Sequence, residues 1–171
     1  MKSKIQELKN TISISVRTKI LFTVALIASV FMQQAFAQDS TKTSTLLTSY
    51  YALKDALVSS NPNAASASAA AFVKAANALD KEMVTTESRN ALVSDATVIS
   101  QTKDLKLQRE KFATLSASLF ELAKTVKLTN EPVYQQYCPM KKASWLSNNK
   151  AIKNPYYGSA MLTCGSVKAT L

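Results

Sequence analysis

Residues Leu105–Lys127, LKLQREKFATLSASLFELAKTVK, carry the clearest helical pattern of the chain. Apolar residues recur in this stretch with a heptad-like spacing, which places them on one face of a helix. Asp104 precedes the stretch as a suitable N-cap, and Lys124 and Lys127 suit the negative end of the helix dipole. We therefore expect one long helix whose inward face consists of Leu105, Phe112, Leu115, Leu119, Leu122 and Val126, with Gln108 as its one polar member.

Three stretches upstream have the same period, and short polar breaks separate them at residues 59–63, 85–88 and 102–104. Asn61 can cap the second stretch, with Pro62 in its first turn. The expected inward residues are Leu46, Tyr50, Leu53 and Leu57 after Thr45; Ala69, Phe72, Ala76, Leu79 and Met83 between Ala64 and Lys81; and Leu92, Ala96 and Ile99 between Arg89 and Gln101. Four amphipathic helices with short connections predict an all-α fold, an antiparallel four-helix bundle.

The pattern changes after Pro132, and the remaining segment, residues 132–171, differs in composition from the helices. It holds both cysteines, both glycines and the single tryptophan of the chain. Residues 133–137 have strand-like composition, residues 154–158 read as a turn, and residues 161–167 are a second short strand or an irregular segment. We expect this segment to pack on the bundle, because a short two-stranded element is not stable alone.

Residues 1–37 have the order of a cleavable signal peptide: a basic leader, an apolar run from Ile20 to Met32, and small residues at Ala35 and Ala37. A membrane anchor is the alternative, but a run of about 13 residues is shorter than the ~20 that a bilayer requires. We expect cleavage before Gln38, a disordered lead-in at 38–44 and one domain at 45–171. The predicted localisation is periplasmic, with no stable membrane anchor after cleavage.

The residue inventory argues against an enzyme. The chain has no histidine, which removes the commonest general base and the usual zinc ligand. It also has no glycine-rich phosphate loop and no serine elbow. Its net charge is +10, but the basic residues of the helices alternate with acidic ones, and an exported protein does not meet nucleic acid. We expect neither catalytic residues nor a nucleic-acid partner.

Sulfur is the remaining chemistry. Cys138 and Met140 lie two positions apart, and Met161 and Cys164 lie three apart. Two thiolates and two thioethers form a soft ligand set, which selects copper(I) and, by extension, silver. In an oxidising compartment the same residues allow a structural Cys138–Cys164 disulfide, with the methionines packed on aromatic rings. The residues alone leave both chemistries open.

At these motifs the chain resembles the secreted bacterial domain-of-unknown-function family 3347. The resemblance rests on Gln108-Arg109, Phe112 and Ser116, and on the C-terminal motifs Tyr137-Cys138-Pro139-Met140, Trp145-Leu146-Ser147, Asn154-Pro155-Tyr156-Tyr157-Gly158, Met161-Leu162 and Cys164-Gly165.

The resemblance implies a periplasmic helical protein, because some members are attached to adaptor subunits of heavy-metal efflux systems. It therefore favours a copper(I)- or silver-binding protein linked to metal efflux, with an efflux component as its partner. The alternative function is a non-catalytic helical interaction module that a Cys138–Cys164 disulfide staples.

Overall fold

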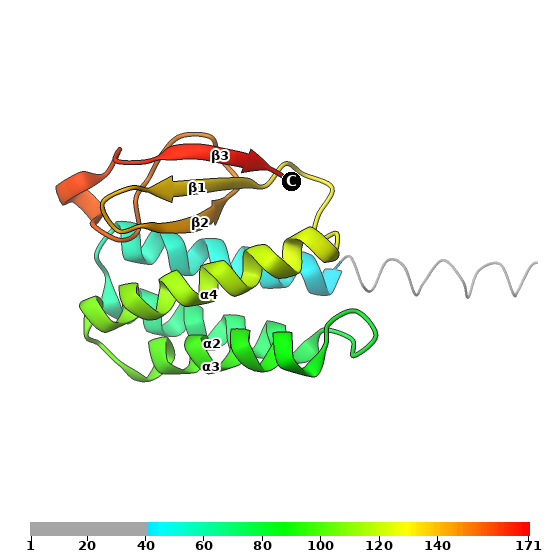
Figure 1. Ribbon diagram of the computed structural model, residues 1–171. Coiled ribbons are helices and arrows are strands. Elements are labelled where there is room, and N and C mark those ends of the chain that lie inside the picture. Colours follow the sequence, from blue (N-terminus) through cyan, green and yellow to red (C-terminus); the bar gives the residue numbers. More distant parts are fainter. Residues whose placement is uncertain (1–40) are drawn as a thin grey trace, which may run out of the picture. The chain divides into compact units, whose positions relative to one another are not determined.

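The computed structural model describes residues 41–171, which form four helices and a small antiparallel sheet (Figure 1). The predicted signal peptide and residues 38–40 of the predicted lead-in lie outside these residues. Residues 41–44, which we expected in the lead-in, already belong to the first helix, residues 41–58. The other helices are α2 (Pro62–Ala78), α3 (Thr86–Gln101) and α4 (Leu105–Thr125). Among the residues that the structure describes, no helix is long and apolar enough to cross a membrane.

The helices begin where the sequence provides a capping side chain. The backbone N–H of Ala64 donates to Asn61 Oδ1 at 3.0 Å at the start of α2, where Pro62 occupies the first turn. At the start of α4, the N–H of Lys106 donates to Asp104 Oδ1 at 2.9 Å. These bonds satisfy backbone donors that have no partner inside the helix. Both predicted caps are therefore confirmed.

The apolar stripes form the core of the helical layers, as their spacing predicts. The side chains at the centre of the core are completely buried, namely Leu46, Tyr50, Leu53, Leu57, Phe72, Leu92, Ile99, Phe112, Leu115 and Leu119. Gln108 is also completely buried, and its amide donates to the carbonyls of Pro62 and Thr102 at 3.0 and 2.9 Å. The one polar member of the α4 stripe thus joins α4 to the first residue of α2 and to the connection between α3 and α4.

The all-α prediction is wrong for the C-terminal segment, which forms three antiparallel strands in the order β2-β1-β3. The strands are β1 (Tyr134–Cys138), β2 (Ala143–Ser147) and β3 (Ser166–Thr170), and a short 3-10 helix, η1 (Gly158–Met161), precedes β3. The first strand lies close to its expected position. The sequence did not indicate β2, because Trp145, Leu146 and Ser147 are all buried and show no alternation.

The sheet packs against the first helix and α4, and α2 and α3 lie on the other side of that helical pair (Figure 1). Tyr50 connects the first helix to α4 and to strand β2. Its hydroxyl lies 2.7 Å from Ser116 Oγ on α4 and accepts the N–H of Leu146 in β2 at 3.0 Å. An aromatic chain continues this junction, because Tyr156 lies 6.0 Å from the Phe112 ring and 5.8 Å from Trp145. The sheet thus shares one core with the helices.

Candidate functional site

The two cysteines meet at one end of the sheet. Cys138 is the last residue of β1, and Cys164 lies between η1 and β3. Because β1 and β3 are antiparallel neighbours, the end of β1 lies beside the start of β3. The two Sγ atoms are 4.0 Å apart, and both cysteines are free. The expectation that these residues lie close in space is confirmed.

Hydrogen bonds from the surrounding turns position the two thiols. The N–H of Lys141 points at Cys138 Sγ, with a nitrogen–sulfur distance of 3.5 Å. On the other side, Asn154 Nδ2 donates to the carbonyl of Cys164 at 2.8 Å. The Asn154 side-chain oxygen accepts a hydrogen bond from the N–H of Tyr156 at 2.8 Å. The backbone N–H of Asn154 donates to the carbonyl of Leu162. The turn at 154–158 therefore holds the Cys164 segment against the end of β1.

The two thiols differ in exposure, and the surroundings of Cys164 raise the pKa of its thiol. Cys138 is completely buried, whereas Cys164 is half-buried. Desolvation raises the pKa of the Cys164 thiol, and its hydrogen bond with Cys138 and the charge of that neighbour raise the pKa further. The Cys164 thiol is thus protonated in the free protein, and the pair is open to solvent from the Cys164 side.

The predicted thioether ligands lie beside the thiols in the chain but on the surface. Met140 is in the turn between β1 and β2 with 63% of its surface exposed, and Met161 ends η1 with 38% exposed. A metal ion held by both thiols and one thioether therefore requires that thioether to turn towards the buried pair. Methionine has three rotatable bonds, which makes such a movement inexpensive.

The sulfur separation fits a shared metal ion. A sulfur–sulfur bond is about 2.05 Å long, much shorter than the 4.0 Å found here. With metal–sulfur bonds of about 2.3 Å, as for zinc thiolates, two sulfurs 4.0 Å apart subtend an angle of about 120° at the metal. That angle leaves room for a third ligand in a trigonal arrangement. Within residues 41–171 there is no group of three or more His, Cys, Asp or Glu that could hold a metal ion.

Several residues that support the site have roles that the sequence did not indicate. Gln136 donates through its amide to the carbonyls of Asn149 and Lys150 at 2.8 and 3.1 Å, which fastens the segment after β2 to β1. Trp145 is the cross-strand partner of Gln136, and its ring lies so close to Gly165 that a Cβ there would be 3.0 Å from Trp145 Cη2. Glycine next to Cys164 thus lets the chain pass over the Trp145 ring. Its close approach to a ring from another strand has no signal in the local sequence.

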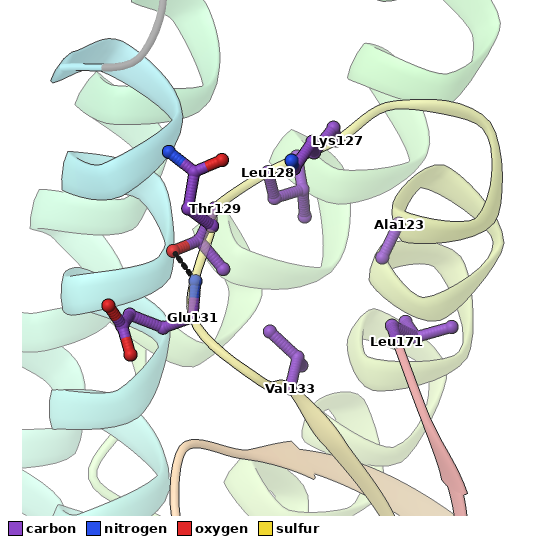
Figure 2. A pocket seen from close by; sticks show the side chains of 8 residues that line it. Ala123, Lys127, Leu128, Thr129, Glu131, Val133 and Leu171 are labelled. Atoms are coloured by element: carbon purple, nitrogen blue, oxygen red, sulfur yellow. Dashed lines mark hydrogen bonds between the residues drawn. The ribbon is translucent and has the colours of Figure 1, made fainter.

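A small cavity of about 160 Å³ lies near the other end of the sheet, below the loop that follows α4 (Figure 2). It lies between Ala123, Leu128, Val133 and Leu171, with Lys127 and Glu131 along the same loop. The dashed line in Figure 2 is a hydrogen bond within that loop, from the Glu131 N–H to Thr129 Oγ1 at 3.1 Å. The walls of the cavity are mostly apolar and contain neither cysteine, so the cavity is separate from the thiol pair.

Comparison with known protein families finds a match for the helical part of the chain. Residues 46–131 match the family described as "Protein of unknown function (DUF3347)". The match runs from the first helix to the loop after α4, and the two cysteines follow it. No curated protein matches the chain, and no solved structure matches it. The match confirms the family resemblance seen in the motifs: the chain belongs to the family of proteins of unknown function DUF3347.

Proposed function

We propose that this protein is a non-enzymatic carrier or buffer for one soft metal ion, copper(I) or silver, held between Cys138 and Cys164. The observation that carries the proposal is the 4.0 Å separation of the two free Sγ atoms. Sulfur ligands select copper(I) over hard cations. Met140 or Met161 supplies a third, thioether ligand.

Metal binding at this pair exchanges protons for the ion. Each thiol releases one proton, and the two thiolates with one copper(I) form a complex of charge −1. The N–H of Lys141 donates towards Cys138 Sγ and stabilises that negative charge. No other residue changes its protonation, and no electron is transferred.

The proposed setting is the periplasm, where the chain passes metal to a component of an efflux system. It depends on export through the leader at residues 1–37 and on the resemblance to efflux-associated members of the family. N-terminal sequencing of the exported protein is expected to find Gln38 as the first residue. A start at Met1 would remove the periplasmic setting and leave the metal chemistry to be tested separately.

The test is competition between the reduced protein and a copper(I) chelator. We expect wild type to withhold one copper(I) per chain, and Cys138→Ser, Cys164→Ser and the double variant to lose this ability. Met140→Leu and Met161→Leu should weaken binding without unfolding the protein, because they preserve volume. Met83→Leu is the matched control, since Met83 is a partly buried methionine packed on the helical core. If the double cysteine variant competes as well as wild type, these sulfurs are not the site.

The second candidate is a helical interaction module in which a Cys138–Cys164 disulfide closes the C-terminal segment. The same short approach of the sulfurs favours it, because a modest movement would bring the two atoms into bonding distance. Mass spectrometry of protein isolated without reductant separates the candidates. A mass lower by two hydrogen atoms, together with no metal uptake after reduction, supports the module.

A further inference from the structure

The exposed large apolar side chains of the described residues all lie in the C-terminal segment. They are Met140, Met161, Leu162, Val167 and Leu171, each with at least 38% of its surface exposed. The same segment, residues 132–171, contains no acidic residue and no arginine. It does contain five exposed lysines, Lys141, Lys142, Lys150, Lys153 and Lys168. Positive charge without acidic side chains therefore coincides with exposed apolar surface in this segment, whereas the helices carry basic and acidic residues together.

Much of this surface lies at the end of the sheet where the two cysteines meet. Residues 139–142 form the turn after β1, and residues 158–164 contain η1, which protrudes at that end (Figure 1). These two segments lie side by side, because Cys138 precedes the first and Cys164 ends the second, and their Sγ atoms are 4.0 Å apart. Lys153 lies beside them, because the N–H of the next residue, Asn154, donates to the carbonyl of Leu162 at 2.8 Å. We call this surface the cationic end; it consists of Met140, Lys141, Lys142, Lys153, Met161 and Leu162.

We propose that the cationic end binds peripherally to an anionic lipid surface. Flexible apolar side chains on two protruding turns can enter the boundary between headgroups and acyl chains, while neighbouring lysines remain at headgroup level. Each lysine near an anionic surface adds attraction, and the C-terminal segment itself carries no carboxylate side chain that would oppose it. The apolar insertion and the electrostatic attraction are both modest, so the binding is reversible and sensitive to salt.

The composition of the cationic end favours lipid over the other occupants. A second copy of the chain is disfavoured because two such surfaces repel one another. An acidic protein is a weaker fit, because protein interfaces are enriched in arginine and aromatic residues and depleted in lysine. All charges here are lysines, and the aromatic rings of this end are not fully exposed. The lysine ammonium is a compact point charge that does not require two acceptors in a fixed geometry. It can therefore bind mobile lipid headgroups, whose acceptors have no fixed arrangement.

The test is sedimentation of the full chain with vesicles of phosphatidylcholine that contain 30% phosphatidylglycerol or none. We expect binding to the anionic vesicles that 0.5 M salt largely removes. The double substitution Lys141→Glu with Lys142→Glu should weaken it by more than about 30-fold, because the loss of two lysines alone accounts for about that factor and the two new carboxylates add repulsion. Lys103→Glu with Lys106→Glu is the matched control, because both lysines are exposed near the start of α4 and the change in net charge is identical.

A fluorescent reporter locates the contact. Met140→Trp places an indole on the cationic end, and its emission should shift to shorter wavelength with anionic vesicles. Ala71→Trp, at an exposed position of α2, should show no shift. Residues 1–40 are common to all variants, so they do not contribute to the differences. Equal binding of the two lysine variants, or an unshifted Met140→Trp emission, overturns the proposal. Binding to polyglutamate without a response to vesicles would assign the cationic end to an acidic protein instead.

Discussion

Cys164 holds its proton more tightly than an ordinary thiol, and this property makes the proposed metal binding dependent on pH. Desolvation raises the pKa of Cys164, and the neighbouring Cys138 raises it further. The metal must therefore displace protons over the whole neutral range. A raised pKa strengthens the competing protons, so the apparent copper(I) affinity should fall as the pH falls. Displacement of two protons predicts a loss of about 100-fold per pH unit.

Chelator competition between pH 6 and 8, corrected for the protonation of the chelator, measures this slope. Cys164→Ser provides the comparison, because only one thiol remains and the slope of any residual binding should be halved. A flat profile for wild type would mean that the metal displaces no thiol protons and is held by other ligands.

Arg109 joins three separate parts of the chain. Its Nε donates to the Pro155 carbonyl at 2.9 Å, and its Nη2 donates to the Leu57 carbonyl at 3.0 Å and to Ser60 Oγ at 2.9 Å. The planar guanidinium group of Arg109 thus holds together α4, the end of the first helix and the turn that positions Cys164. Lysine keeps the charge but cannot reproduce the fork.

We expect Arg109→Lys to lower the free energy of unfolding by about 1–3 kcal/mol, because carbonyls lose their donors. Urea unfolding measures the change. Lys106→Ala, which removes an exposed lysine of the same helix, should change stability by less than about 0.5 kcal/mol. If the two variants were equally stable, the fork would contribute no net stability.

Gly158 is required by both its backbone angle and its surroundings. Its φ is +56°, and a Cβ there would lie 2.7 Å from Ser60 Oγ, 2.8 Å from Arg109 Nη2 and 2.9 Å from the Val58 carbonyl. Gly158→Ala should therefore cost about 2–4 kcal/mol from left-handed strain and overpacking together. Thermal unfolding beside Ser159→Ala, an exposed neighbour, tests this. A melting temperature equal to that of Ser159→Ala would contradict the tight approach.

At the scale of elements, the edge strand β2 depends on one side chain from the first helix. The Leu146 N–H donates to Tyr50 Oη, which also bonds Ser116. Tyr50→Phe should leave this buried N–H without a partner and lower the free energy of unfolding by about 1–3 kcal/mol. Tyr51→Phe, at a half-buried position on the same helix, is the matched control.

The same tyrosine makes stability depend on pH at the alkaline end. Burial raises the pKa of Tyr50 well above its usual value near 10. The unfolded phenol ionises from about pH 10 upward while the folded one stays neutral, so the free energy of unfolding falls as the pH rises above 10. Tyr50→Phe should show a shallower fall. Equal slopes in the two proteins would mean that Tyr50 does not ionise on unfolding.

The helices were predictable from sequence, whereas the sheet was predictable only in part, for a physical reason. Helix period, caps and breaks are local, so Asn61, Asp104 and the stripe ending at Leu122 were readable from neighbours in the chain. Strand β2 is recognisable only through its partners, the paired residues of β1 and the hydroxyl of Tyr50. The approach of Cys138 to Cys164 was expected from the turn between them. The supporting roles of Gln136 and Gly165 depend on contacts that no local pattern encodes.

At the scale of the whole molecule, the charge is unevenly distributed. The helical layers mix basic and acidic residues, whereas the sheet layer carries only lysines. The cationic end and the thiol pair occupy the same end of that layer. Under both proposals, bound metal would therefore lie close to the lipid surface. The two proposals remain separate, since Lys141→Glu with Lys142→Glu tests lipid binding and Cys138→Ser with Cys164→Ser tests metal binding.

The helical layers and the sheet should unfold as one unit, because they share one core. Leu119 is completely buried on α4, where the helices and the sheet both pack. Leu119→Asp places an unpaired carboxylate in this core, which should cost more than about 4 kcal/mol and unfold most of the domain. Ala117→Asp puts the same charge on an exposed site of the same helix and should leave the domain folded. Far-ultraviolet dichroism reports the helices, and the near-ultraviolet signal of Trp145 reports the sheet. Loss of both signals together in Leu119→Asp is the expected result, whereas loss of one alone would mean that the two layers fold independently.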